Sequence, residues 1–510
     1  MTAPEEPTPP PSGRTRFRLE VFYNWPGLLG LALIAVNVAA ALVVFVADLL
    51  IGVEYVGVVY ALLGLATALG AAVAAFGGLL GLGRRRRGAA SRLLEPWTFD
   101  LMRSRDRRFA FAGLVATVLL LGVFASATGQ GVRYLESRDF CVNVCHAVME
   151  PEGTAALHSP HANIACADCH VGSGAVHFAR AKLNGMRQLW GVVSGSYPRP
   201  IPVPIPGMLP AGQVCEGCHA RNHWIGYREK QYTYFAGDEQ NTVHPLRMLI
   251  KVGGLRPSSG RGEGIHYHML LDRKVEYVAA DPQKSEILWV RVTEADGEVR
   301  TYRREEEGSD EAVSGKPVHV MGCLDCHNRP AHQFRAPTDL MNALMASGRV
   351  DSGLRSIKTK GVALLEEPYP DRATALASID QQLRALYESG QERPPGDPAV
   401  ATAIAAIQEV WALNNFPAMN VSWRAYPNHI GHRDSAGCFR CHNDELMTDS
   451  GETVFTDCKG CHLVLTQGNG FEASPVDFEQ GIPFFHFADE ESFEDYEDCS
   501  SCHNGGSDIY

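Results

Sequence analysis

The chain has 510 residues, of which 45% are hydrophobic and 20% charged, a composition that excludes both a disordered protein and one buried wholly in a membrane. Its formal net charge is -12, with a basic front end up to residue 138 and an acidic remainder. Because nucleic-acid binding requires a positive surface, we expect no nucleic-acid partner for the acidic main part.

Three apolar runs in the first part of the chain predict a membrane anchor. They follow a Pro-rich tail (residues 1–24) and cover Pro26–Val46, Tyr55–Leu82 and Phe109–Thr128, each about long enough to cross a bilayer. The Arg-rich segment 84–108 separates the last two runs, and the positive-inside rule places it in the cytoplasm together with the N-terminus. The length of the first run, and the two runs after it, disfavour the alternative of a cleaved signal peptide.

We therefore predict a three-helix anchor over residues 25–128 in a bacterial inner (cytoplasmic) membrane. An odd number of crossings places everything from residue 129 onward on the outer, periplasmic side. That side suits the chemistry predicted for the cysteines, since c-type haem is attached there.

The fourteen cysteines form seven pairs, and the second member of every pair is followed directly by histidine. This C-x-x-C-H pattern is typical of covalent haem attachment, in which both thiols form thioethers and the histidine binds the iron. The first pair has one extra residue between its thiols. The predicted haem-binding cysteines are Cys141, Cys145, Cys166, Cys169, Cys215, Cys218, Cys323, Cys326, Cys438, Cys441, Cys458, Cys461, Cys499 and Cys502, and the predicted proximal ligands are His146, His170, His219, His327, His442, His462 and His503.

Two other uses of paired cysteines are less consistent with this pattern. A zinc ribbon does not need histidine after each second cysteine, and a redox dithiol explains one pair rather than seven. No cysteine is left over for a disulfide.

A low-spin haem that carries electrons needs a second axial ligand, either histidine or methionine. The predicted distal ligands are Met149, His161, His266, His268, His332, His429 and His432, with His158 as a further candidate beside His161. The sequence does not pair any of them with a particular haem.

The motif spacing divides the periplasmic part into four predicted segments. They are a three-haem domain at 129–225, a β-containing insertion at 226–322, the fourth haem with a helical scaffold at 323–437, and a C-terminal three-haem segment at 438–510. Alternating residues around Asp296-Gly297 favour a β-hairpin within Tyr277–Tyr302. Helical patterns cover Ala373–Tyr387 and Ala399–Leu413. We expect a mainly α fold with irregular haem-packed segments and a small antiparallel β insertion.

Several motifs together carry a family resemblance. Phe140-Cys-Val-Asn-Val-Cys-His-Ala-Val-Met149, Cys166-Ala-Asp-Cys-His170, Lys182 and Cys215-Glu-Gly-Cys-His219 resemble the NapC/NirT family of membrane quinol dehydrogenases over about residues 109–220. The three apolar runs and seven motifs of the whole chain resemble the inner-membrane heptahaem branch of that family. The usual first motif of the family is C-x-x-C-H with methionine two residues after the histidine. Here that motif is longer, and Met149 follows His146 by three residues.

The resemblance implies seven covalent haem c groups and oxidation of menaquinol beside the first haem, with Lys182 at the quinol site. The expected partners are the menaquinone pool and periplasmic c-type cytochromes or other redox partners. Two further hypotheses are a non-enzymatic relay subunit of a larger membrane redox complex and a terminal reductase with an open haem. The surplus of histidine argues against a reductase except at the first haem, where a five-coordinate iron is the alternative to Met149 ligation.

Overall fold

A computed structural model describes residues 25–51, 56–86 and most of 129–484, together with isolated positions between 104 and 126 and at 503, 505 and 506. The gaps within 129–484 are at 144–145, 173–174, 206–207, 220–225, 256–261, 271, 305–312, 390–391, 455 and 469–479. The chain divides into two compact units, Met1–Leu135 with Ser173–Gly185, and Glu136–Gly172 with Met186–Tyr510.

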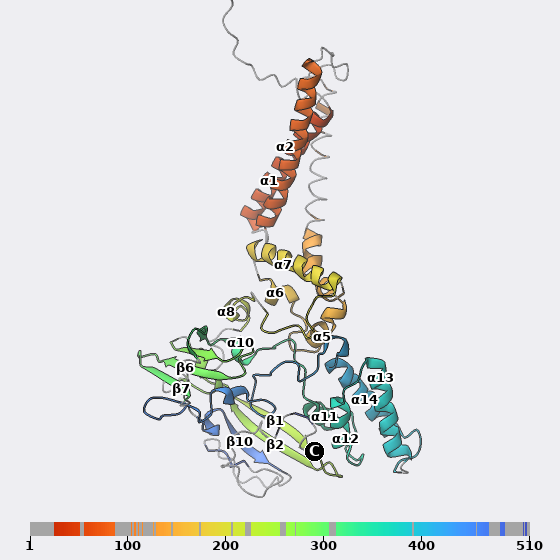
Figure 1. Ribbon diagram of the computed structural model, residues 1–510, viewed down its shortest axis with the longest axis vertical. Helices are drawn as coiled ribbons and strands as arrows, with labels where there is room; N and C mark the ends of the chain where they lie inside the picture. Colours follow the sequence, from red (N-terminus) through yellow and green to blue (C-terminus); the bar gives the residue numbers. More distant parts are fainter. Residues whose placement is uncertain are drawn as a thin grey trace, which may run out of the picture. The chain divides into compact units, whose positions relative to one another are not determined.

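The first unit contains two long apolar helices, α1 (Trp25–Ile51) and α2 (Val56–Arg86), which pack side by side (Figure 1). Glycine permits their close approach, because a Cβ on Gly30 would lie 2.5 Å from the carbonyl oxygen of Gly70. Within α1, Pro26–Val44 is long and apolar enough to cross a membrane, and the described part of α2 holds a shorter apolar stretch. The predicted third span at Phe109–Thr128 falls almost entirely outside the described residues, so three spans remain a prediction.

Short helical turns carry the described cysteine motifs. The helices of this region are α4 (Arg138–Asn143), α5 (His146–Leu157), α6 (Cys166–His170), α7 (Ala175–Ser194), α8 (Ala211–Val214), α10 (Cys323–Cys326), η6 (Gly437–Arg440) and η7 (Cys458–Gly460). Residues three apart lie on one face of such a turn. Both thiols of a motif can therefore reach the same edge of one porphyrin.

In the part of the chain that the structure describes, the β structure consists of two antiparallel sheets and a small two-stranded ladder. The first sheet has the order β1 (Tyr227–Phe235), β2 (Val243–Lys251), β10 (His462–Gln467). The second has the order β8 (His319–Val320), β5 (Lys274–Ala279), β6 (Ile287–Thr293), β7 (Val299–Arg304), β9 (Leu446–Met447), and the ladder joins β3 (Gly254–Leu255) to β4 (Gly262–Glu263). The predicted hairpin is confirmed as β6–β7, which turns at Gly297 with φ 89°.

Strands β9 and β10 come from the C-terminal part of the chain. Each pairs with a strand of the predicted insertion, β10 with β2 and β9 with β7. The β structure is therefore assembled from distant parts of the sequence rather than from residues 226–322 alone.

Four helices form the scaffold, α11 (Pro337–Ala346), α12 (Ile357–Glu366), α13 (Arg372–Arg384) and α14 (Pro398–Asn414), and they lie together in Figure 1. The helices predicted at Ala373–Tyr387 and Ala399–Leu413 are thus confirmed, with the last turn of the first continuing as a π-helix. The carboxylates of Asp371 and Asp397 cap the starts of α13 and α14. Buried apolar side chains fill the space between these helices.

Candidate haem-binding sites

The thiols of successive cysteine motifs lie close together in the second unit. A hydrogen bond from Cys141 of the first motif, helped by Arg138, lowers the pKa of the free Cys166 thiol in the second motif to about 6. Burial raises the pKa of Cys215 in the third motif to about 11, with contributions from Cys323 of the fourth motif and Cys169 of the second. The first four motifs therefore follow one another in space as they do in the chain.

The same succession continues through the fifth and sixth motifs. Burial raises the pKa of the Cys326 thiol to about 11, and the neighbouring Cys438 of the fifth motif adds to the shift. Burial and Cys438 also raise the pKa of Cys461, in the sixth motif, to about 11. None of the eleven described cysteines is in a disulfide.

Five predicted distal histidines face a proximal histidine. The ring centroids are 6.1 Å apart for His161–His219, 6.0 Å for His170–His332, 6.3 Å for His266–His327, 5.7 Å for His268–His442 and 6.1 Å for His432–His462. Two imidazoles bound to opposite sides of one metal at about 2.0 Å place their centroids roughly 6 Å apart. The five pairs thus have the spacing that a haem iron between them requires.

Backbone carbonyl groups orient the distal imidazoles. The Nδ1 atoms of His161, His266, His268, His332 and His429 lie 3.2, 3.0, 3.0, 3.0 and 3.1 Å from the carbonyl oxygens of Pro330, Val252, Ile265, Glu152 and Asp325. An Nδ1–H that donates to a carbonyl leaves the Nε2 lone pair available to a metal. Such a hydrogen bond to Nδ1 is usual for a histidine that binds a metal through Nε2, because it fixes the orientation of the ring.

Burial also keeps two of the paired imidazoles, one predicted distal and one predicted proximal, in the neutral form that binds a metal. It lowers the pKa of His268 to about 4, with a contribution from His442. It lowers the pKa of His462 to about 4 as well, with a contribution from His432. A histidine must be unprotonated at the nitrogen that binds iron, so both rings are ready to bind at neutral pH.

The 3-10 helix η3 (Ile265–Met269) carries two predicted distal histidines that face two different motifs. His266 faces His327 of the fourth motif, and His268 faces His442 of the fifth. The turn begins at Gly264, whose φ is 76° and where a Cβ would lie 2.4 Å from the carbonyl oxygen of Lys251. Only glycine fits there, and one short segment carries histidines that face the fourth and the fifth motif.

Two polar clusters support the sites and were missed in the sequence. Glu152 accepts from Arg329 at 3.0 Å and lies 3.1 Å from Nδ1 of His332. The sequence offers no local signal for this contact, since Glu152 and His332 are far apart in the chain.

The second cluster joins the fourth and fifth motifs. Arg440, inside the fifth motif, donates to the carbonyl oxygens of Lys284 at 2.6 Å and of Asp325 at 2.8 Å. Asp325 lies inside the fourth motif, and its buried carboxylate accepts from Lys284 and from the hydroxyl of Tyr277. These contacts hold the two haem-binding turns at a fixed separation.

Several predicted site residues lie partly or wholly outside the described residues. Cys145, Cys499 and Cys502 are not described, nor is the side chain of His146, which begins α5. Met149 lies partly buried in that helix. The haem ligands of every motif stay predictions, and the five opposed pairs of rings belong to the second to sixth motifs.

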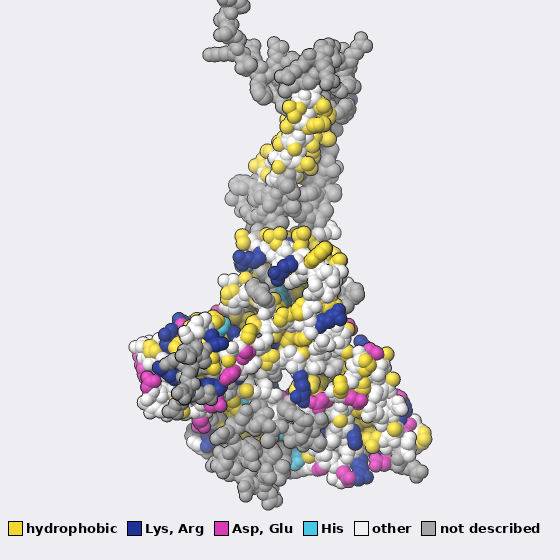
Figure 2. Space-filling model, viewed as in Figure 1, with side chains coloured by type: hydrophobic (Ala, Val, Ile, Leu, Met, Phe, Trp, Pro, Cys, Tyr) yellow, Lys and Arg dark blue, Asp and Glu magenta, His cyan; other side chains and the backbone are white. Residues whose placement is uncertain are grey.

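Lys182 lies in α7 and is held by its own unit. Its Nζ donates to the carbonyl oxygen of Leu135 at 2.9 Å and lies 4.9 Å from the ring centroid of Phe178. The same helix exposes a row of large apolar side chains, Val176, Leu183, Met186, Trp190 and Val193, each at least 70% exposed. Hydrophobic side chains gather along this helix in Figure 2, with Lys and Arg among them.

The composition of α7 is typical of a helix that lies in a membrane interface. Arg180 and Arg187 border the apolar row, and the helix contains no acidic residue. Such helices bury their apolar face among lipids, while basic side chains reach the headgroups.

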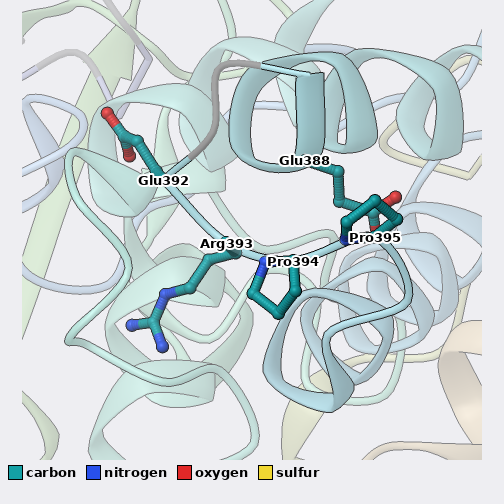
Figure 3. A pocket seen from close by; sticks show the side chains of 5 residues that line it. All are labelled: Glu388, Glu392, Arg393, Pro394 and Pro395. Atoms are coloured by element: carbon teal, nitrogen blue, oxygen red, sulfur yellow. The ribbon is translucent and has the colours of Figure 1, made fainter.

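Two features of the described residues lie apart from the haem motifs. The pocket in Figure 3 is lined by Glu388, Glu392, Arg393, Pro394 and Pro395, at the end of the scaffold, and has no histidine or cysteine in its lining. Within the described ranges, no group of three or more His, Cys, Asp or Glu side chains is placed to hold a bare metal ion.

Cysteine pairs on helical turns, opposed imidazoles and an apolar N-terminal helix define the class, a membrane-bound multihaem c-type cytochrome. Residues 104–200 match the N-terminal region of the NapC/NirT cytochrome c family. The chain is 36% identical over 408 residues, 79% of each protein, to cytochrome c-type protein ImcH of Geobacter sulfurreducens. The chain therefore belongs to the NapC/NirT family, with a close likeness to ImcH, and it takes covalent haem c for electron transfer.

A second relative matches over a shorter stretch. The cytochrome c nitrite reductase subunit NrfH of Nitratidesulfovibrio vulgaris is 48% identical over 52 residues, which are 10% of this chain and 31% of that protein. No solved structure matches.

Proposed function

We propose that the protein carries seven covalent haems, oxidises menaquinol beside the first haem at the outer face of the inner membrane, and passes electrons to periplasmic redox partners. In this proposal the fourteen cysteines bind the haems, the seven motif histidines are proximal ligands, and the five opposed histidines are distal ligands. Three spans with a cytoplasmic N-terminus hold the haem-binding part on the periplasmic side.

The observation that carries the proposal is the succession of motifs in space. Thiols of the first to sixth motifs neighbour one another in chain order, and five motif histidines face a second imidazole. Six-coordinate irons arranged in a row favour electron transfer over small-molecule catalysis, because catalysis needs an open iron position. This order supports the proposal of an electron conduit that has the first motif at one end.

Helix α7 supports the proposal that menaquinol is oxidised beside the first haem. Menaquinol is dissolved in the membrane, so it has to be met by residues at the lipid surface. Helix α7 carries Lys182 together with the exposed apolar row. A cationic side chain near the lipid surface is suited to orient a quinol hydroxyl. Oxidation of the quinol releases two protons, and its two electrons enter the haems one at a time.

Quinol-driven haem reduction tests the proposal. Purified protein is mixed with a reduced menaquinol analogue, and the haem absorbance is followed. We expect rapid reduction in the native protein, and a rate lower by roughly tenfold or more in Lys182→Ala, because loss of a group that assists proton transfer has effects of about that size or larger.

Arg187→Ala, on the same helix, is the matched control and should keep the native rate. Equal rates in Lys182→Ala and the native protein would remove Lys182 from the quinol site. Reduction by dithionite but not by the quinol would favour the alternative function, a relay subunit that receives electrons from another protein of a membrane complex.

A further inference from the structure

A buried arginine near the fifth motif has a guanidinium nitrogen without a hydrogen-bond partner among the described residues. This nitrogen is Nη1 of Arg273, whose side chain is 15% exposed. Arginine stays charged in proteins, and a buried charged donor that is left unpaired is costly. Such an atom therefore indicates that Arg273 binds an acceptor outside the polypeptide, and an anion suits its charge best.

The other contacts of Arg273 hold its guanidinium group in place. Its Nε donates to the carboxylate of Glu294, and its Cζ lies 3.9 Å from the ring centroid of Tyr267. The hydroxyl of Tyr267 donates to the same carboxylate at 2.8 Å. Glu294 and Tyr267 therefore fix the position of the guanidinium group and leave Nη1 to another acceptor.

The ring of Tyr267 links this arginine to the fifth motif. Tyr267 lies between His266 and His268 in η3, and its ring meets the ring of His268 edge to face, with centroids 6.4 Å apart. His268 in turn faces His442 of the fifth motif, with centroids 5.7 Å apart. The guanidinium group is thus one aromatic ring away from the predicted distal imidazole of the fifth haem.

Haem c itself carries anions that suit this arginine. Each haem has two propionate groups, which are carboxylates at the edge of the porphyrin. Arginine pairs well with a carboxylate, because its nitrogens form a planar fork of donors. A propionate belongs to the cofactor that the fifth motif is predicted to bind, so no additional ligand is needed to satisfy Nη1.

We infer that Arg273 binds a propionate of the haem at the fifth motif through Nη1, while Glu294 and Tyr267 hold its guanidinium group. The inference rests on the proposed function, since it takes covalent haem at this motif, with His268 and His442 as axial ligands, as given. It goes further by assigning a residue to the porphyrin edge. Reduction adds a negative charge to the haem, so this cation stabilises the reduced form and raises the reduction potential.

Arg273→Gln tests the contact by two measurements on the haem-loaded protein. Resonance Raman spectroscopy detects the bending modes of the propionates, which change when a hydrogen bond to a propionate is lost. We expect one such mode to change, while mass spectrometry finds the native number of haems. In a redox titration, the equilibrium constant for reduction of one haem should fall about tenfold, which is roughly 59 mV for a one-electron couple.

Arg300→Gln is the matched control, because Arg300 contacts the same carboxylate of Glu294 but has a carboxylate partner at each guanidinium nitrogen. These partners are Glu298 at 3.2 Å, Glu294 at 3.5 Å and Glu452 at 3.8 Å. The control should keep the native propionate modes, and a change equal to that in Arg273→Gln would overturn the inference.

Arg273→Lys separates the charge of Arg273 from its hydrogen bonds. Lysine keeps the positive charge but lacks the planar fork, so the potential should stay near its native value while the propionate mode changes. This variant also covers the case in which Arg273→Gln does not fold. Propionate modes that are unchanged in every folded variant of Arg273 would overturn the inference, while the proposed function stands.

A methionine ligand identifies the haem that responds. His268→Met should give the fifth haem a methionine ligand, which raises its potential and sets it apart from the other haems. Adding Arg273→Gln should then lower the potential of this marked haem. A shift at an unmarked haem assigns Arg273 elsewhere and overturns the inference alone. If His268→Met marks no haem, the ligand pair in the proposed function is wrong, and the inference fails with it.

Discussion

The helical scaffold α11–α14 and the haem-binding segment 136–219 are stabilised in different ways. The scaffold has a continuous core of apolar side chains, several of them fully buried, such as Met341, Ile379 and Ile407. Across the described residues of the haem-binding segment, the buried large hydrophobic side chains are Val148 and Phe178. The scaffold therefore folds around its own side chains, whereas the haem-binding segment needs covalent haem to fill its interior.

The largest expected effect comes from withholding haem. Protein made without haem attachment should lose protection from hydrogen exchange throughout 136–219, because too little apolar surface is buried there to offset chain entropy. Helices α11–α14 should stay protected. Hydrogen-exchange mass spectrometry on the haem-free and haem-loaded proteins makes the comparison, and equal protection of the two regions in the haem-free protein would contradict it.

A smaller effect is expected from a cavity in the scaffold. Ile407, in α14, is fully buried, and Ile407→Ala should lower the free energy of unfolding of the scaffold by about 2–5 kcal/mol. The haem spectrum and the number of haems should not change. Denaturant-induced unfolding, monitored by hydrogen exchange in α11–α14, measures the loss of free energy of unfolding.

Thr402→Ala, at an exposed position of the same helix, is the control for Ile407→Ala and should change stability by less than about 0.5 kcal/mol. A changed haem spectrum in Ile407→Ala would show that the two regions are not stabilised separately.

The smallest effect concerns a buried charge. Lys358, in α12, donates from Nζ to the carbonyl oxygen of Thr338 and to Oδ1 of Asn342, both at 2.8 Å, and burial lowers its pKa to about 7. Because the unfolded chain holds this proton to higher pH than the folded one, the stability of the scaffold should rise as pH increases above about 7. From about pH 7 to about pH 9 we expect a gain of roughly 1–2 kcal/mol.

In Lys358→Met this contribution to the pH dependence should disappear. Unfolding at the two pH values, in the native protein and the variant, measures it. If the free energy of unfolding changed equally with pH in the variant and in the native protein, the Lys358 ammonium would not be the source of the pH dependence.

Local chemistry explains what could be predicted from the sequence. The proximal histidines follow from C-x-x-C-H spacing, the β6–β7 turn from Asp296-Gly297, and helices α13 and α14 from periodicity. The opposed histidine pairs could not be predicted, because they join distant residues. His332 follows the fourth motif but faces His170 of the second, and His266 and His268, only two residues apart, face different motifs.

The β structure shows the same limit of local patterns. Alternation predicts strands in the insertion, but their partners β9 and β10 belong to the C-terminal segment. Nothing near Val243–Lys251 in the sequence indicates that it pairs with His462–Gln467.

The first sheet cannot be completed until the C-terminal part of the chain, which contains strand β10, has been synthesised. Strand β10 begins at His462, the predicted proximal histidine of the sixth motif, and supplies the last strand of a sheet that starts at Tyr227. Such distant pairing forms late, and until it forms β2 has an unpaired edge open to other chains. A truncated polypeptide without β10 would keep that edge exposed and aggregate, so we expect only chains that include β10 to accumulate as folded protein.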